Sequence, residues 1–158
     1  MNTRISYKNV DPKAPQLLLA VEAHIRASKL ESKLLHLVKM RASQINGCAF
    51  CLDMHSKDAR ADGESEQRLY SLDAWHEAPY YSDRERAALE WTEAVTTLSD
   101  GHAPDSVYEK VRANFREDEI AALTLSIAMI NAWNRLNVAF RTEAGGYRPG
   151  MFNDLRTA

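Results

Sequence analysis

The spacing of apolar residues constrains the fold of this chain more than any other feature. Apolar residues recur at intervals of three and four, as on one face of a helix, and period-two alternation of β-branched residues is nearly absent. Only six Gly and five Pro residues interrupt the 158 residues, mostly near the ends of apolar segments. We therefore predict an all-α fold, with residues 1–158 forming a single domain.

Local signals set the expected helix boundaries. Pro12 and Pro104 are typical of helix starts, Asn46-Gly47 of a break, and Ser82 with Glu85 has the spacing of a capping box. We expect helices at about 12–28, 31–44, 48–61, 65–72, 83–98, 104–114 and 117–141, with a short piece near Trp75 and an irregular tail after Gly145-Gly146. The predicted buried stripes comprise Leu17, Leu18, Val21 and Ile25 in the first helix, and Ala88, Leu89, Trp91, Val95 and Leu98 in the fifth.

The last long helix differs from the others. Its segment from Ile120 to Ile130 is apolar nearly all round, which predicts burial on several sides. In a small domain another subunit can supply part of that burial, so we expect a homo-oligomer formed through apolar helices.

Charge and composition narrow the partners. The net charge of −2 and scattered Lys and Arg residues give no reason to expect nucleic-acid binding. No apolar run approaches the roughly 20 residues of a membrane span, and the first residues lack the apolar core of a signal peptide. We therefore expect a cytoplasmic protein with no membrane partner. In that reducing setting a CxxC pair is more often redox-active or metal-binding than a structural staple.

Both cysteines of the chain, Cys48 and Cys51, stand just before His55. Thiols three residues apart can close into a disulfide on one helical turn, and a histidine four residues after Cys51 lies on the same helix face. The first turn of a helix favours an anion, and His55 can accept a proton from Cys51. The helix start alone favours Cys48 as the attacking thiol. The spacing to His55 favours Cys51, which we prefer, with Cys48 as resolving thiol.

Three other interpretations of this motif compete. Cys48, Cys51 and His55 could be three zinc ligands, with His36 or His24 completing the site through the fold. The cysteines could instead be buried and inert, or His55 could only cap or pack. Tyr70, Trp75, Tyr80, Tyr81 and Trp91 could line a pocket, although core packing is the more common role of such aromatics. Asp53 and Asp58 share the helix of the motif, where solvated charges are the more common reading.

The motif resembles the alkylhydroperoxidase D (AhpD-like) branch of the carboxymuconolactone decarboxylase superfamily. The resemblance rests on residues 37–55, which read Leu-Val-Lys-Met-Arg-Ala-Ser-Gln-Ile-Asn-Gly-Cys-Ala-Phe-Cys-Leu-Asp-Met-His, and extends through 88–96 and 130–135. It implies an all-α fold assembled into trimers or hexamers. It also implies a peroxidase mechanism with Cys51 peroxidatic, Cys48 resolving and His55 as relay base. We expect no metal or cofactor.

Two positions depart from the family pattern. Many relatives carry a glutamate twelve residues before the first cysteine, where this chain has His36. A histidine can shuttle protons but cannot stabilise an imidazolium by charge, so we hypothesise that His36 is a substitute relay member. Ala49-Phe50 separates the cysteines where characterised alkylhydroperoxidase D proteins carry a histidine, which predicts a weaker relay or another substrate. Decarboxylases of the superfamily usually lack the cysteine pair.

The sequence therefore favours an enzyme that reduces hydrogen peroxide or organic hydroperoxides, with an external dithiol or redoxin as reductant. A redox-responsive dithiol protein without turnover is the main competitor from a different class. A lyase or decarboxylase using His55 as general base is the third interpretation.

Overall fold

The structure is a computed structural model that describes residues 2–152. It is all-α, and no strand occurs among these residues. The longer helices include α2 (Lys13–Arg26), α3 (Ser32–Ile45), α4 (Ala49–Ala61) and α8 (Glu117–Phe140). The others are α1 (Tyr7–Val10), α5 (Glu66–Tyr70), α6 (Asp83–Thr96) and α7 (Asp105–Asn114), with short 3₁₀ turns η1 (Leu72–Ala74) and η2 (Leu98–Asp100).

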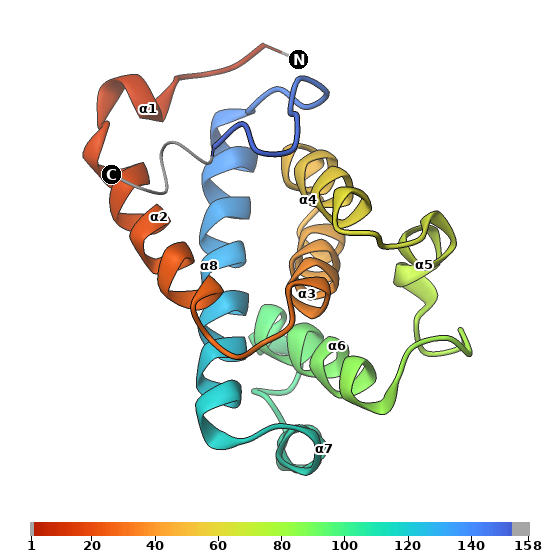
Figure 1. Cartoon of the computed structure of the whole chain (residues 1–158). Coiled ribbons are helices and arrows are strands. Elements are labelled where there is room, and N and C mark those ends of the chain that lie inside the picture. Colours follow the sequence, from red (N-terminus) through yellow and green to blue (C-terminus); the bar gives the residue numbers. More distant parts are fainter. Residues whose placement is uncertain (1, 153–158) are drawn as a thin grey trace.

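Helix α8 is the axis of the fold, with α2 along one side and α3 and α4 along the other (Figure 1). It also contacts α6 and α7, which explains why its sequence is apolar nearly all round. The main core lies where α8 meets α2, α3, α6 and α7, and includes Ile25, Val38, Val111, Leu123 and Ile127. The prediction that this helix is buried on several sides is thus confirmed within one chain.

The predicted boundaries hold within a few residues because the chain carries clear capping signals. Ser82 and Glu85 form the predicted capping box at the start of α6, with each side chain bonded to the other's backbone N–H. Gly47 adopts a positive φ of 63° in the turn between α3 and α4, a conformation that glycine adopts at low cost. This turn lets α3 and α4 pack side by side as a helical hairpin.

Three details of the helix prediction were wrong. Leu17 is 70% exposed, because α2 turns its neighbours Leu18, Val21 and Ile25 toward the core and leaves Leu17 at the edge of the stripe. Leu98 is 52% exposed, because α6 ends at Thr96 and Leu98 begins the turn η2. The short helix α1 was not predicted. No helix in residues 2–152 is both long and apolar enough to cross a membrane.

Candidate functional site

The turn from α3 into α4 positions the two cysteines. Asn46 ends α3, and its side-chain N–H donates to Asn131 Oδ1 and Asn134 Oδ1 of α8, both at 2.9 Å. Asn134 donates in turn to the Ser43 hydroxyl at 3.0 Å. These buried amide contacts fix the start of α4 against α8.

Cys48 is the N-cap of α4, and Cys51 lies in its first turn. The Cys48 sulfur accepts the backbone N–H of Cys51 at 3.3 Å, which is the bond that an N-cap side chain normally makes. A disulfide joins the two residues, with 5.4 Å between their Cα atoms, so the sequence-based expectation of a disulfide on one helical turn is confirmed. The structure therefore represents the oxidised form of the pair.

Both cysteines are buried. Cys48 is 1% and Cys51 0% exposed, and they pack with Ala42, Ile130, Phe50 and Trp133. Asn137 of α8 places its side-chain Nδ2 3.6 Å from the Cys51 sulfur, within the range of a hydrogen bond to sulfur. The sulfurs thus lie in an apolar layer between α4 and α8, with the amide of Asn137 directed at Cys51.

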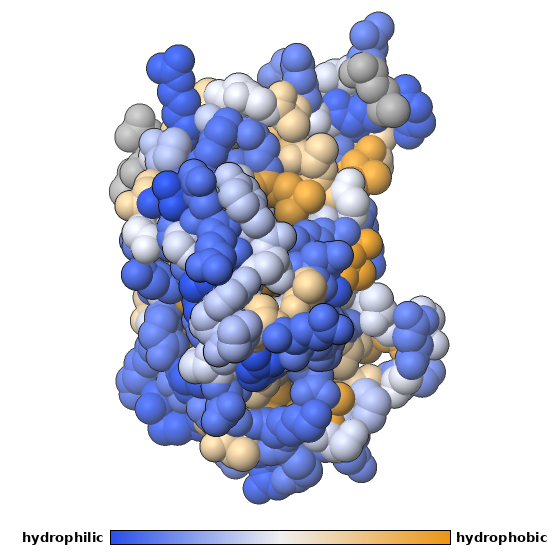
Figure 2. Space-filling view, turned by 90° about the vertical axis from the view of Figure 1, so that its right-hand side faces the viewer, coloured by the Kyte–Doolittle hydropathy of each residue, from blue (hydrophilic) through white to orange (hydrophobic). Residues whose placement is uncertain are grey.

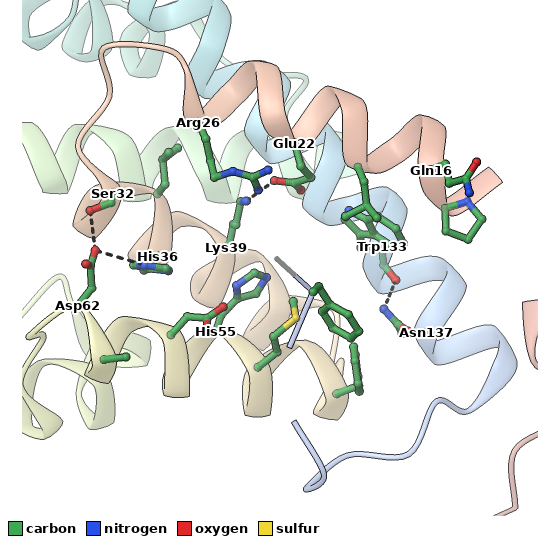
Figure 3. A pocket seen from close by; sticks show the side chains of 18 of the residues that line it. Gln16, Glu22, Arg26, Ser32, His36, Lys39, His55, Asp62, Trp133 and Asn137 are labelled. Carbon is green, nitrogen blue, oxygen red and sulfur yellow. Dashed lines mark hydrogen bonds and ion pairs between the residues drawn. The ribbon is translucent and has the colours of Figure 1, made fainter. Parts of the chain in front are cut away.

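A cavity of about 580 Å³ opens beside this layer, between α2, α3, α4 and α8 (Figure 3). One part of its wall is apolar, with Leu19, Met54, Phe50, Trp133 and Phe152 among its members. The other part is polar and carries His36, Lys39 and His55 together with acidic residues. A cavity with a large apolar wall and a few convergent polar groups is the usual form of a small-molecule site.

Two polar pairs form the charged wall. Lys39 Nζ of α3 lies 2.5 Å from Glu22 Oε2 of α2, and both residues are buried. Arg26 points toward the same pair (Figure 3). His36 Nε2 lies 3.5 Å from Asp62 Oδ2, which also accepts the Ser32 hydroxyl at 2.5 Å. The buried charges of Glu22 and Lys39 are paired because desolvating either one alone is costly, whereas Asp62 is partly exposed.

His36 and His55 both line the cavity, and their rings project into it from the facing helices α3 and α4 (Figure 3). Burial lowers the pKa of His36 below its ordinary value of 6.5, although the nearby carboxylates of Asp58 and Asp62 act in the opposite direction. A neutral imidazole can accept a proton at neutral pH. The structure thus brings both predicted histidines to one cavity, while the relay role of each remains a prediction.

Helix α4 is also held from outside by the segment that follows α8. Asp53 accepts the backbone N–H of Gly145 at 3.0 Å, and Asp58 accepts the hydroxyl of Tyr147 at 2.7 Å. Lys57 donates to the carbonyl oxygens of Gly145 and Tyr147. Both carboxylates thus fasten this segment to the helix of the motif, beyond the solvated role expected as the more common one, and Asp58 also lines the cavity.

Residues 12–94 match the sequence model of the carboxymuconolactone decarboxylase family. The chain belongs to this family. Among its relatives is the uncharacterized protein YdfG of Bacillus subtilis, 41% identical over 91% of this chain and 98% of the relative. The predicted family membership is thus confirmed.

Solved structures share this fold. A protein of unknown function from Agrobacterium tumefaciens, for which an AhpD antioxidant defence role has been suggested, is 44% identical, with a TM-score of 0.89 over 92% of this chain and 100% of its own. A debrominase in complex with a tribromopyrrole has a TM-score of 0.79 at 18% identity, covering 93% of this chain and 79% of its own. The second likeness is one of fold alone.

The structure adds cavity residues that the sequence analysis did not identify, among them Glu22, Lys39, Trp133 and Asn137. Core packing, the more common role expected of the five aromatic residues named from sequence, holds for Trp75, Tyr81 and Trp91. The aromatic residues that line this cavity are Phe50, Trp133 and Phe152. The overlooked signal was Asn131, Asn134 and Asn137, three amides at intervals of three in the C-terminal half of a helix that also carries a long apolar segment. Within residues 2–152, no group of three or more His, Cys, Asp or Glu side chains is placed to hold a metal ion.

Proposed function

We propose that this member of the family is a thiol-dependent peroxidase, with Cys51 as attacking thiol, Cys48 as resolving thiol and His55 as proton carrier. The observation that carries the proposal is the Cys48–Cys51 disulfide at the start of α4, beside a cavity lined by His55. This is the oxidised state that such a cycle must pass through. The suggested antioxidant role of the Agrobacterium relative is in keeping with it.

Two contacts support Cys51 as the attacking residue. Its sulfur receives the side-chain N–H of Asn137, which itself lines the cavity, whereas the Cys48 sulfur receives a backbone N–H as the cap of α4. His55 follows Cys51 by one helical turn, so both groups lie on one face of α4. Helix N-termini favour a thiolate at either position, which leaves the side-chain contacts to decide between them.

The first step forms a sulfur–oxygen bond. The Cys51 thiolate attacks the terminal oxygen of a hydroperoxide ROOH, the O–O bond breaks, and the products are a sulfenic acid and an alkoxide. The imidazolium of His55 gives its proton to the alkoxide, which leaves as the alcohol ROH. The sulfur is oxidised by two electrons and the peroxide is reduced by two.

The second step closes the disulfide. The Cys48 thiol loses its proton to a base in the cavity, and its sulfur attacks the Cys51 sulfenic acid. The hydroxide that leaves takes that proton and departs as water. An external dithiol or redoxin then exchanges with the disulfide and restores both thiols while its own pair becomes a disulfide.

The size and lining of the cavity favour organic hydroperoxides over hydrogen peroxide. Its volume of about 580 Å³ far exceeds the roughly 30 Å³ that a water molecule occupies in the liquid. Leu19, Met54 and Trp133 supply apolar surface for the organic part of the substrate. We therefore expect faster oxidation by a bulky apolar hydroperoxide than by hydrogen peroxide.

Burial of the sulfurs favours a second candidate function. With Cys48 at 1% and Cys51 at 0% exposure, a bulky reductant has no direct path to the disulfide in this conformation. A buried cysteine pair of this kind suits a redox-responsive protein, in which slow oxidation to the disulfide changes the protein surface without catalytic turnover. Rapid kinetics separate this function from a peroxidase.

The test is stopped-flow oxidation of the reduced protein by cumene hydroperoxide and by hydrogen peroxide. The parent, Cys48→Ser, Cys51→Ser and His55→Ala proteins form the series. A peroxidase predicts fast oxidation of the parent and Cys48→Ser proteins, loss in Cys51→Ser, and slower oxidation in His55→Ala. Uniformly slow oxidation would contradict the peroxidase and favour the redox-responsive protein. Lyase activity that survives both serine substitutions but not His55→Ala would favour the lyase.

A further inference from the structure

Asn137 is the polar side chain of α8 that reaches the disulfide. It is 5% exposed and lies on the cavity wall, and its helix is far in the sequence from the cysteine motif. Its Nδ2 donates to the carbonyl oxygen of Trp133 at 2.9 Å and to the Cys51 sulfur at 3.6 Å. Buried amides of this kind normally have all their polar atoms bonded.

The two bonds fix the orientation of the amide. A backbone carbonyl and a cysteine sulfur are both acceptors, so the atom that faces them must be the donor nitrogen rather than the oxygen. Both hydrogens of Nδ2 are thereby used. The other end of the amide, Oδ1, is buried and has no hydrogen-bond partner anywhere in residues 2–152.

We propose that Asn137 is a further catalytic residue, whose Nδ2 stabilises the Cys51 thiolate and whose Oδ1 accepts a hydrogen bond from the O–H group of the hydroperoxide. The inference rests on the proposed function for its second half, because only that half involves the substrate. These two roles predict the chemical class of the ligand. It is a neutral molecule with an O–H donor near the Cys51 sulfur and an apolar part against Met54 and Trp133.

The role of Nδ2 follows from the charge on the reduced sulfur, and the role of Oδ1 follows from its lack of a hydrogen-bond donor among residues 2–152. A thiolate is a much stronger acceptor than a disulfide sulfur, so the bond from Nδ2 strengthens when the pair is reduced. An unpaired buried acceptor is costly, and a ligand that donates to it recovers that cost. An alkoxide or a carboxylate has no hydrogen to donate, so Oδ1 favours ROOH over the alkoxide that leaves. The protonated alcohol product keeps a donor but no longer has the peroxide bond.

The first experiment measures the pKa of Cys51 in the Cys48→Ser background, where one thiol remains. The rate of alkylation by iodoacetamide is followed from pH 5 to pH 10, and the thiolate absorbance is recorded in parallel. Asn137→Leu removes the donor at similar size, and we expect its Cys51 pKa to rise by about one unit, a tenfold loss of thiolate below that pKa. Asn137→Asp should raise it further, because a carboxylate replaces the donor beside the sulfur.

The second experiment measures the rate of oxidation by cumene hydroperoxide, divided by the thiolate fraction at each pH. Asn137→Leu lacks the acceptor, so this corrected rate should fall about tenfold, the effect of one lost hydrogen bond of about 1.4 kcal/mol in the transition state. Asn137→Asp keeps an oxygen acceptor, and its corrected rate should remain within about twofold of the background protein. The larger pKa rise is thus expected in Asn137→Asp and the larger loss of corrected rate in Asn137→Leu. General damage to the fold does not produce this reversal of order.

Asn114→Asp is the control for the chemical change. Asn114 is the last residue of α7, which does not line the cavity, and its side-chain Nδ2 donates to the Lys110 carbonyl at 2.9 Å. Its Cys51 pKa and corrected rate should equal those of the background protein. If Asn137→Leu fails to fold, Asn137→Ala and Asn137→Asp carry the same comparison.

An unchanged Cys51 pKa in the Asn137 variants would overturn the role of Nδ2, and an unchanged corrected rate in Asn137→Leu would overturn the role of Oδ1. If the background protein is alkylated but does not react with the hydroperoxide, the proposed peroxidase fails. The alkylation profiles then still decide whether Asn137 stabilises the thiolate.

Discussion

His36 lies on the wall of the cavity, and its surroundings determine how it titrates. Burial in the cavity wall lowers its pKa, while Asp58 and Asp62 favour the charged form and Lys39 opposes it. The unfolded chain takes up a proton on this residue near pH 6.5, whereas the folded protein does so only at lower pH. Between these two values the unfolded state binds more protons, so folding stability falls as pH falls.

We predict that the free energy of unfolding decreases between pH 7.5 and pH 5.5, and that His36→Asn removes part of this decrease. Urea titrations across this pH range measure it. His102→Asn, at an exposed position, is the control and should leave the pH profile of the parent. An identical slope in the parent and His36→Asn proteins would contradict the lowered pKa of His36.

Of the residues at the site, those within one helix could be predicted from the sequence. Cys48, Cys51 and His55 lie within eight residues on one helix, where spacing alone determines which side chains share a face. Asn137 lies 86 residues from Cys51 and reaches it only because α8 packs against α4. Glu22 and Lys39 likewise meet through the packing of separate helices, which spacing in the sequence does not encode.

Between elements, the pair Glu22–Lys39 joins α2 to α3 across the charged wall of the cavity. The two atoms lie 2.5 Å apart and both side chains are about nine-tenths buried. Removing one partner of such a pair leaves a buried charge without compensation, which typically costs about 3–5 kcal/mol. Replacing both by apolar side chains of similar size is often nearly neutral.

We predict that Glu22→Gln destabilises the protein by about 3 kcal/mol, because Lys39 loses its carboxylate while Arg26 points toward the same place. The double variant Glu22→Leu/Lys39→Met should recover most of this loss. Denaturant unfolding of Glu22→Leu, Lys39→Met and the double variant measures the coupling between the two side chains. Glu90→Gln, which breaks the exposed pair with Lys110, should cost at most about 1 kcal/mol. A similar small cost for Glu22→Gln would contradict the buried-pair argument.

Helix positions were predictable to the extent that local signals decide them. The capping box of Ser82 and Glu85 and the Asn46-Gly47 break are local, and the structure has both. The rotation of a helix about its own axis depends on its neighbours, which is why Leu17 was expected to be buried and is not. The predicted burial of Leu98 was wrong for a related reason, because the end of α6 depends on how the chain turns into η2.

At the scale of the whole molecule, the two sides differ in how they expose apolar side chains. The face that carries α5 and α6 is covered mainly by hydrophilic side chains, with apolar ones in small separate groups (Figure 2). Leu17 lies on α2, on the other side of the molecule from α5 (Figure 1), and is 70% exposed although its helix is patterned for burial. A second copy of the chain that covers α2 would bury Leu17 and so reconcile its apolar character with its exposure in the single chain.

We therefore predict that the protein is a homo-oligomer whose interface includes α2. Sedimentation equilibrium should give a multiple of the 17.9 kDa chain mass, with a trimer or hexamer expected from the family resemblance. Leu17→Glu places a charge in the interface and should shift the mass toward that of the single chain, because an unpaired charge is costly to bury. Tyr70→Glu is the matched control, since Tyr70 is 78% exposed on α5, and it should leave the mass unchanged. A parent protein that sediments as one chain would contradict the oligomer, whereas an oligomer that only Tyr70→Glu dissociates would move its interface to the face of α5.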